Sequence, residues 1–101
     1  MVITSGVTAQ QMGKTLAEAL HGQPRIAEIW VTTRPDGVHI WLIVEPIETE
    51  EQRRLYLFAD VLHERFPGYP AMLHILNPRN HRGDIHLSLP VDATPVVREL
   101  R

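Results

Sequence analysis

The sequence contains no cysteine. Disulfide bonds, thiolate zinc sites and cysteine nucleophiles are therefore excluded. The 101 residues also carry little net charge, formally −2 at pH 7. The chain therefore has no strong basic field that would attract nucleic acid or an anionic membrane. From these absences we expect a cytoplasmic protein without a nucleic-acid partner.

Long hydrophobic runs are missing as well. The longest apolar stretch, residues 40–44, is far shorter than the about 20 residues that a membrane-spanning helix needs. The first residues do not combine a basic segment with an apolar core, which a secretory signal requires. The length suits one domain, so we expect a single soluble domain over residues 1–101 with no membrane partner.

A β-hairpin is predicted in the first half of the chain. Residues 26–33 and 38–45 are rich in β-branched and aromatic residues and flank a Pro35-Asp36-Gly37 turn. Because side chains alternate across a strand, each strand should have two distinct faces. One face is aliphatic and should meet the helices: Ala27, Ile29, Val31, Val38, Ile40, Leu42 and Val44. The other is mixed: Ile26, Glu28, Trp30, Thr32, His39, Trp41, Ile43 and Glu45.

Two helices are expected around this hairpin. Thr8 and Gln11 have the spacing of a capping box, and an apolar stripe follows, so we predict a helix over residues 9–21. A second stripe, containing Leu55, Phe58 and Leu62, predicts a helix over residues 48–66.

The remaining residues predict further strands. Residues 71–76 form a short apolar run, residues 84–89 are a candidate fourth strand, and Val96-Val97 is a candidate edge pair. The element order is then α-β-β-α-β(-β). We predict an α+β two-layer sandwich, ferredoxin-like or related, with the helices on one face of the sheet.

The mixed face of the sheet is the main candidate for function. Trp30, Trp41, Ile43 and Met72 should project from it. An exposed apolar face usually marks an interface, and tryptophan is enriched in interface hot spots. We therefore expect a non-enzymatic interaction or dimerisation module, bound to a protein partner or to itself as a homodimer. The alternative is that residues near either end of the chain fold over this face and cover it.

Histidines provide a second interpretation. His39, His74 and His86 fall on three predicted strands, and three histidines are able to hold zinc. This hypothesis makes the chain a metal- or ligand-binding protein or an enzyme. However, the sequence has no H-x-x-x-H or H-E-x-x-H spacing, and isolated strand histidines are more often hydrogen-bonded or solvated. We find no nucleophile-elbow, P-loop or dinucleotide motif and expect no cofactor.

One family resemblance joins several of these segments. The stretch A-L-H-G-Q-P-R-I-A-E-I-W-V, the hairpin, the helix and the strand A-M-L-H-I-L follow one another over residues 16–76. This order resembles the cytoplasmic C-terminal domain of cation diffusion facilitators and also small bacterial α+β proteins. The resemblance implies a ferredoxin-like, dimer-forming module. That family has a histidine two places before the first-strand tryptophan, where this chain has Glu28, so its metal ligands do not transfer.

Overall fold

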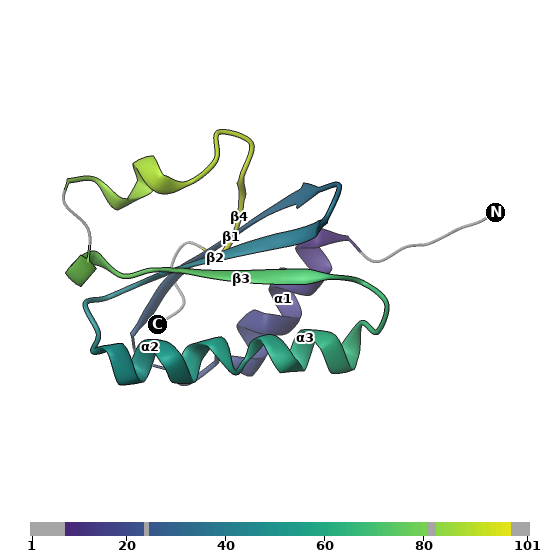
Figure 1. The fold of residues 1–101 in the computed structure, drawn as a ribbon, viewed down its shortest axis with the longest axis horizontal. Coiled ribbons are helices and arrows are strands. Elements are labelled where there is room, and N and C mark those ends of the chain that lie inside the picture. Colours follow the sequence, from purple (N-terminus) through teal and green to yellow (C-terminus); the bar gives the residue numbers. More distant parts are fainter. Residues whose placement is uncertain (1–7, 24, 81–82, 98–101) are drawn as a thin grey trace.

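The computed structural model describes residues 8–23, 25–80 and 83–97. It is a two-layer α+β sandwich, as predicted, with the α-helices below one sheet face (Figure 1). The helices are α1 (Ala9–Ala19), α2 (Thr49–Tyr56) and α3 (Ala59–Arg65). The strands are β1 (Ile26–Arg34), β2 (Gly37–Val44), β3 (Ala71–Leu76) and β4 (Thr94–Val97), and two 3-10 helices, η1 (Pro78–Asn80) and η2 (Ile85–Ser88), lie between β3 and β4.

The sheet is mixed, and its strand order is β3-β2-β1-β4. β1 is antiparallel to both β2 and β4, whereas β2 and β3 are parallel neighbours. A ferredoxin-like sheet contains split βαβ units, in which another strand lies between the two parallel ones. Here β2 and β3 pair directly, so the fold is related to the ferredoxin-like arrangement without sharing its strand order.

The predicted helices form, but the second one is interrupted. The capping box of α1 is present: the Gln11 N–H donates to Thr8 Oγ1 at 3.1 Å and the Thr8 N–H donates to Gln11 Oε1 at 2.7 Å. The helix predicted over residues 48–66 is two helices separated at Leu57 and Phe58. The Phe58 N–H donates to Leu55 O, three residues back, at 3.0 Å. This tighter hydrogen bonding interrupts the α-helix without a glycine or proline to signal it.

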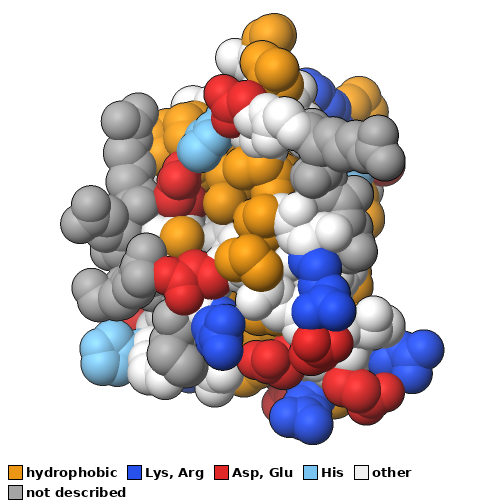
Figure 2. All heavy atoms as spheres, turned by 90° about the vertical axis from the view of Figure 1, so that its left-hand side faces the viewer, with side chains coloured by type: hydrophobic (Ala, Val, Ile, Leu, Met, Phe, Trp, Pro, Cys, Tyr) orange, Lys and Arg blue, Asp and Glu red, His pale blue; other side chains and the backbone are white. Residues whose placement is uncertain are grey.

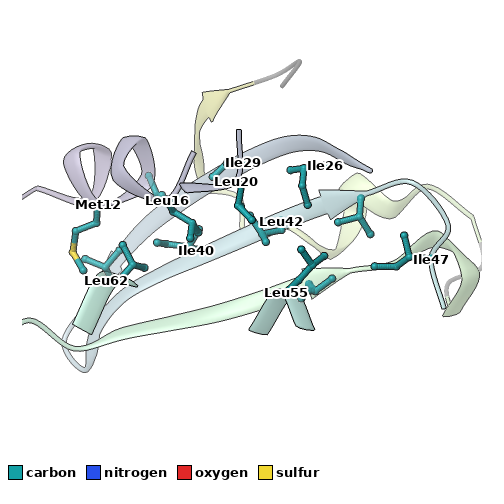
Figure 3. Packing of buried hydrophobic residues seen from close by; sticks show 14 residues of the cluster. Met12, Leu16, Leu20, Ile26, Ile29, Ile40, Leu42, Ile47, Leu55 and Leu62 are labelled. Carbon is teal, nitrogen blue, oxygen red and sulfur yellow. The ribbon is translucent and has the colours of Figure 1, made fainter. Parts of the chain in front are cut away.

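The main core lies between the helices and the sheet (Figure 3). Met12 and Leu16 reach it from α1, and Leu20 reaches it from the C-cap of that helix. Leu55 and Leu62 reach it from α2 and α3. All five are at most 6% exposed. Fully burying such a side chain contributes about 1.5–3 kcal/mol, so the helical stripes fix the packing of the layers.

A β-bulge near the start of β1 changes which face of the sheet Ile26 occupies, compared with the prediction. The strand alternation predicts Ile26 on the mixed face and Ala27 on the core face. The pairing register shifts between Ile26 and Glu28, and Ile26 lies in the core with no exposed area. An extra residue in one strand reverses the alternation on one side of it, which moves Ile26 to the helical side.

The C-terminal part differs from the predicted fourth strand. Residues 84–89 do not form a strand, because Asp84 caps the 3-10 helix η2 and accepts a hydrogen bond from the His86 N–H at 2.9 Å. The fourth strand is β4, and it pairs with β1. The candidate edge pair at Val96-Val97 is therefore confirmed. Gly13 allows α1 to approach β4, because a Cβ there would lie 2.6 Å from Val96 Cγ2.

Candidate functional site on the outer sheet face

The outer face is the side of the sheet that points away from the α-helices. The pairing registers arrange its side chains in rows across β1, β2 and β3. One row contains Trp30, Trp41 and His74. Rows on either side contain Thr32, His39 and Met72, and then Glu28, Ile43 and Leu76. The four predicted contact residues and two of the three predicted histidines therefore share one face.

Part of this face is covered by the chain itself. Trp41, Ile43 and Leu76 are at most 9% exposed and form a second apolar cluster. Ile85 and Leu89 pack against that cluster; we call residues 85–89 the C-terminal cover. In Figure 1 this segment lies above the sheet, opposite the helices.

The cover changes the interpretation of the predicted contact residues. Trp41 and Ile43 are at most 9% exposed in the monomer, so the chain itself covers most of both side chains, and their contact with a partner stays a prediction. The covering alternative applies to them. Trp30 and Met72 are only half-buried.

Figure 2 shows one end of the molecule, where hydrophobic side chains gather in the upper half and charged side chains gather lower down, where α2 begins.

Polar contacts hold the chain around the cover at two points. The His86 Nε2 atom lies 2.9 Å from Glu28 Oε2, and the Trp30 Nε1–H donates to Glu28 Oε1 at 2.8 Å. Further along, the Asp92 carboxylate accepts hydrogen bonds from Thr32 Oγ1 and from the Arg34 guanidinium. These contacts join the C-terminal segment to β1 before β4 begins.

His39 and His74 form a hydrogen-bonded pair beside Trp41. Their Nδ1 and Nε2 atoms, respectively, are 2.8 Å apart, and their ring planes differ by 8°. This short contact between nearly parallel rings means that the rings meet edge to edge. The His74 ring also stacks on Trp41, with centroids 4.8 Å apart. Asp36, from the hairpin turn, completes the chain, with Oδ1 3.0 Å from His39 Nε2.

The contacts fix where the protons lie when both rings are neutral. The Asp36 carboxylate only accepts, so His39 Nε2 carries the hydrogen and His39 Nδ1 accepts from His74 Nε2–H. His74 Nδ1 is then the second unprotonated nitrogen of the pair, the one that takes no part in the contact between the two rings. Burial, and to a lesser extent His39, holds the pKa of His74 below its ordinary value of 6.5. The hydrogen bond from His39 lowers the pKa of Asp36.

His86 belongs to a different cluster from the other two histidines. It lies on η2 between the carboxylates of Glu28 and Asp84. The hydrogen bond to Glu28 raises the pKa of His86 above 6.5. The three predicted metal ligands therefore do not converge. Among residues 8–23, 25–80 and 83–97, no group of three or more histidine, aspartate or glutamate side chains is placed to hold a metal ion.

Sequence reasoning missed the carboxylates that position these histidines. The sequence pattern identifies Asp36 only as part of the hairpin turn, although Asp36 precedes His39 by three positions. Similarly, Asp84 precedes His86 by two positions. These short spacings were the available signal. The contact from Glu28 to His86 spans 58 positions, and no local pattern announces it.

Two of the open surface depressions of the molecule lie on the helical layer. One lies beside the start of β3 and is lined by His63, Phe66, Gly68, Tyr69 and Pro70. The other lies along α2 and α3 and includes Leu57 and Val61. Neither contains a histidine of the outer face. No helix within the described residues is long and apolar enough to cross a membrane.

Comparisons with known proteins add no assignment. No protein-family model matches the chain, and neither a curated protein nor a solved structure matches it. The resemblance to the cation diffusion facilitator domain therefore stays an expectation, and the geometry of the chain itself carries the functional argument.

Proposed function

We propose that this chain is a non-enzymatic protein-interaction module that acts as a homodimer or as a subunit bound to another protein. Its contact surface is the part of the outer face that the C-terminal cover leaves open, around Trp30, Met72 and His74. One observation carries the proposal: Trp30 on β1 and Met72 on β3 are large apolar side chains of the outer face that stay half-buried, and β3 contains no lysine, arginine, aspartate or glutamate. Tryptophan and methionine are enriched at interfaces. The lack of cysteine supports a cytoplasmic location.

The burial of Trp41 and Ile43 limits the size of this surface. Both side chains belong to the second apolar cluster and, being at most 9% exposed, add little area to the contact surface. The contact then depends on Met72, on β3 and on the accessible part of Trp30. Specific interfaces bury about 800 Å² per partner, so neighbouring residues along β3 have to contribute as well.

An alternative function rests on the His39–His74 pair. The unprotonated His74 Nδ1 is a hydrogen-bond acceptor on a ring that Asp36 orients through His39. Such a nitrogen is able to accept a proton or bind a small ligand. We rank this function second because, among the residues that the structure describes, no group of three or more histidine, aspartate or glutamate side chains is placed to hold a metal ion.

The association state tests the first proposal. We expect sedimentation equilibrium to show a dimer at micromolar concentration, and Met72→Asp to weaken it at least about tenfold, whereas Met72→Leu keeps it. Leu87→Ala is the matched surface control, because Leu87 is 83% exposed on the C-terminal cover. If the protein and both Met72 variants are monomers at several hundred micromolar, the homodimer is excluded, and the subunit bound to another protein is the remaining form of this proposal.

A further inference from the structure

The outer side of β3 is an open sheet edge. The strand order places β3 at one end of the sheet, with β2 as its one neighbour among the strands described here. Figure 1 shows β3 as the strand nearest the viewer, with the helices below it and the C-terminal cover above. In that view neither layer lies across this edge; residues 71–74 are half-buried, whereas Ile75 and Leu76 are at most 9% exposed.

Backbone geometry identifies the groups that point outward from the edge. The Val38 N–H donates to Pro70 O at 3.0 Å, so the carbonyl of Pro70 points toward β2. Along a strand, the N–H and C=O of one residue point to the same side and the side alternates. Ala71, Leu73 and Ile75 therefore direct their N–H and C=O groups away from β2. Each offers one donor and one acceptor to an added strand.

The β3 edge has none of the usual protection. Its six residues, AMLHIL, contain no lysine, arginine, aspartate, glutamate or proline. Exposed edges are normally protected by charges, prolines, bulges or short length. The opposite edge, β4, is four residues long and contains Pro95. The β4 edge is therefore protected by its short length and its proline, whereas the β3 edge lacks both and is the better candidate for pairing with another strand.

We propose that β3 pairs antiparallel with β3 of a second copy of this chain, so that the two sheets become one. This inference rests on the proposed self-association and specifies its geometry. A two-fold dimer brings the same patch of both copies together, and two β3 edges then run antiparallel. Apart from His74, the residues of β3 that face one another are apolar, and β3 brings no lysine, arginine, aspartate or glutamate to the contact.

The faces of the sheet restrict the register of this pairing. Residues directly opposite one another lie on the same face, and a one-residue slip would place core residues on the outer face. The central registers that satisfy this condition place Leu73 opposite Leu73 of the other copy, or His74 opposite His74 of the other copy. The depression beside the start of β3, lined by Phe66, Tyr69 and Pro70, lies next to this edge and adds apolar contact area. Tyr69 is 44% exposed there.

Amide hydrogen exchange, read residue by residue by NMR, tests the pairing directly. Leu73 and Ile75 should exchange rapidly in dilute protein and slowly in concentrated protein. Where about nine in ten chains are dimeric, exchange through the free monomer slows about tenfold. The Met72 and His74 amides, which point toward β2, should show little dependence on concentration. They serve as internal controls within the same strand.

A proline substitution provides the matching variant. Leu73→Pro removes an outward N–H without removing a β2–β3 hydrogen bond, and Leu73→Ala loses the side-chain packing but keeps the N–H. We expect the proline variant to be a monomer and the alanine variant to dimerise, with helical circular dichroism confirming the fold of each. A dimer whose Leu73 and Ile75 amides exchange independently of concentration would overturn the β3 pairing and leave the interaction module standing. A monomer under every condition would overturn both the β3 pairing and the proposed homodimer, and would leave only the subunit bound to another protein.

Discussion

Replacing Trp41 with alanine should destabilise the monomer instead of weakening an interface. Trp41 is 9% exposed and packs with Ile43 and Leu76 under the C-terminal cover. Its ring also stacks on His74 at a centroid distance of 4.8 Å. The substitution would remove one of the three buried members of the second apolar cluster and the ring that stacks on both His39 and His74. The folded state loses these contacts whether or not a second copy is bound.

The expected loss is large for a domain of this size. Truncating a buried tryptophan to alanine costs about 3–5 kcal/mol, and small domains are stable by only about 5–15 kcal/mol. A loss of 1 kcal/mol lowers the Tm of a domain of this length by about 4 °C or more. We therefore expect Trp41→Ala to lower the Tm by at least about 12 °C. Trp41→Phe keeps an aromatic ring and should lose less than half as much.

Urea unfolding followed by far-ultraviolet circular dichroism measures this loss at a concentration where the chain is monomeric. Leu89→Ala and Leu87→Ala are paired controls on the cover itself. Leu89 packs on the cluster, whereas Leu87 is exposed, so only the first should destabilise. A Trp41→Ala variant that unfolds within about 1 kcal/mol of the parent, far below the usual cost of a buried tryptophan, would show that the cover does not bury this side chain in solution.

Two further predictions concern pH and a buried amide. The folded-state pKa of His74 is lowered and that of His86 is raised. The His74 contribution should therefore be complete above about pH 6.5 and lost on acidification, while the His86 contribution is complete below about pH 6.5 and lost as the pH rises through its folded-state pKa. Comparing urea midpoints of His74→Gln and His86→Gln with the parent from pH 5 to 8 tests these opposite trends, and parallel curves would contradict them. Asn77, 2% exposed, donates to Ile47 O at 2.8 Å and accepts from the Ile47 N–H at 3.2 Å. Asn77→Ala should cost about 2 kcal/mol or more in urea unfolding because both groups lose their partner, Asn77→Asp keeps the acceptor as a control, and a midpoint equal to that of the parent would refute the contact.

The sequence alone determined the layers of this protein. Helical stripes such as Met12-Leu16-Leu20 and the alternating residues of β1 and β2 are local patterns with different periods. Each pattern indicates which side of its helix or strand is apolar and must be buried. The capping box at Thr8 is equally local, because its two hydrogen bonds join residues three apart. Element type and core face therefore follow from neighbouring residues, and the α+β sandwich follows from their order.

Tertiary structure decided which outer residues meet and which are covered. The apolar residues Ile85 and Leu89 suit a strand by composition, yet Asp84 caps a 3-10 helix that packs them onto Trp41. The bulge beside Ile26 shifts a face without a glycine or proline to mark it. His39 meets His74 because β2 and β3 pair in parallel, while His86 meets Glu28 across 58 positions. Such contacts depend on the strand order and on the register. Both are set by the free energy of the whole chain, and no single segment encodes them.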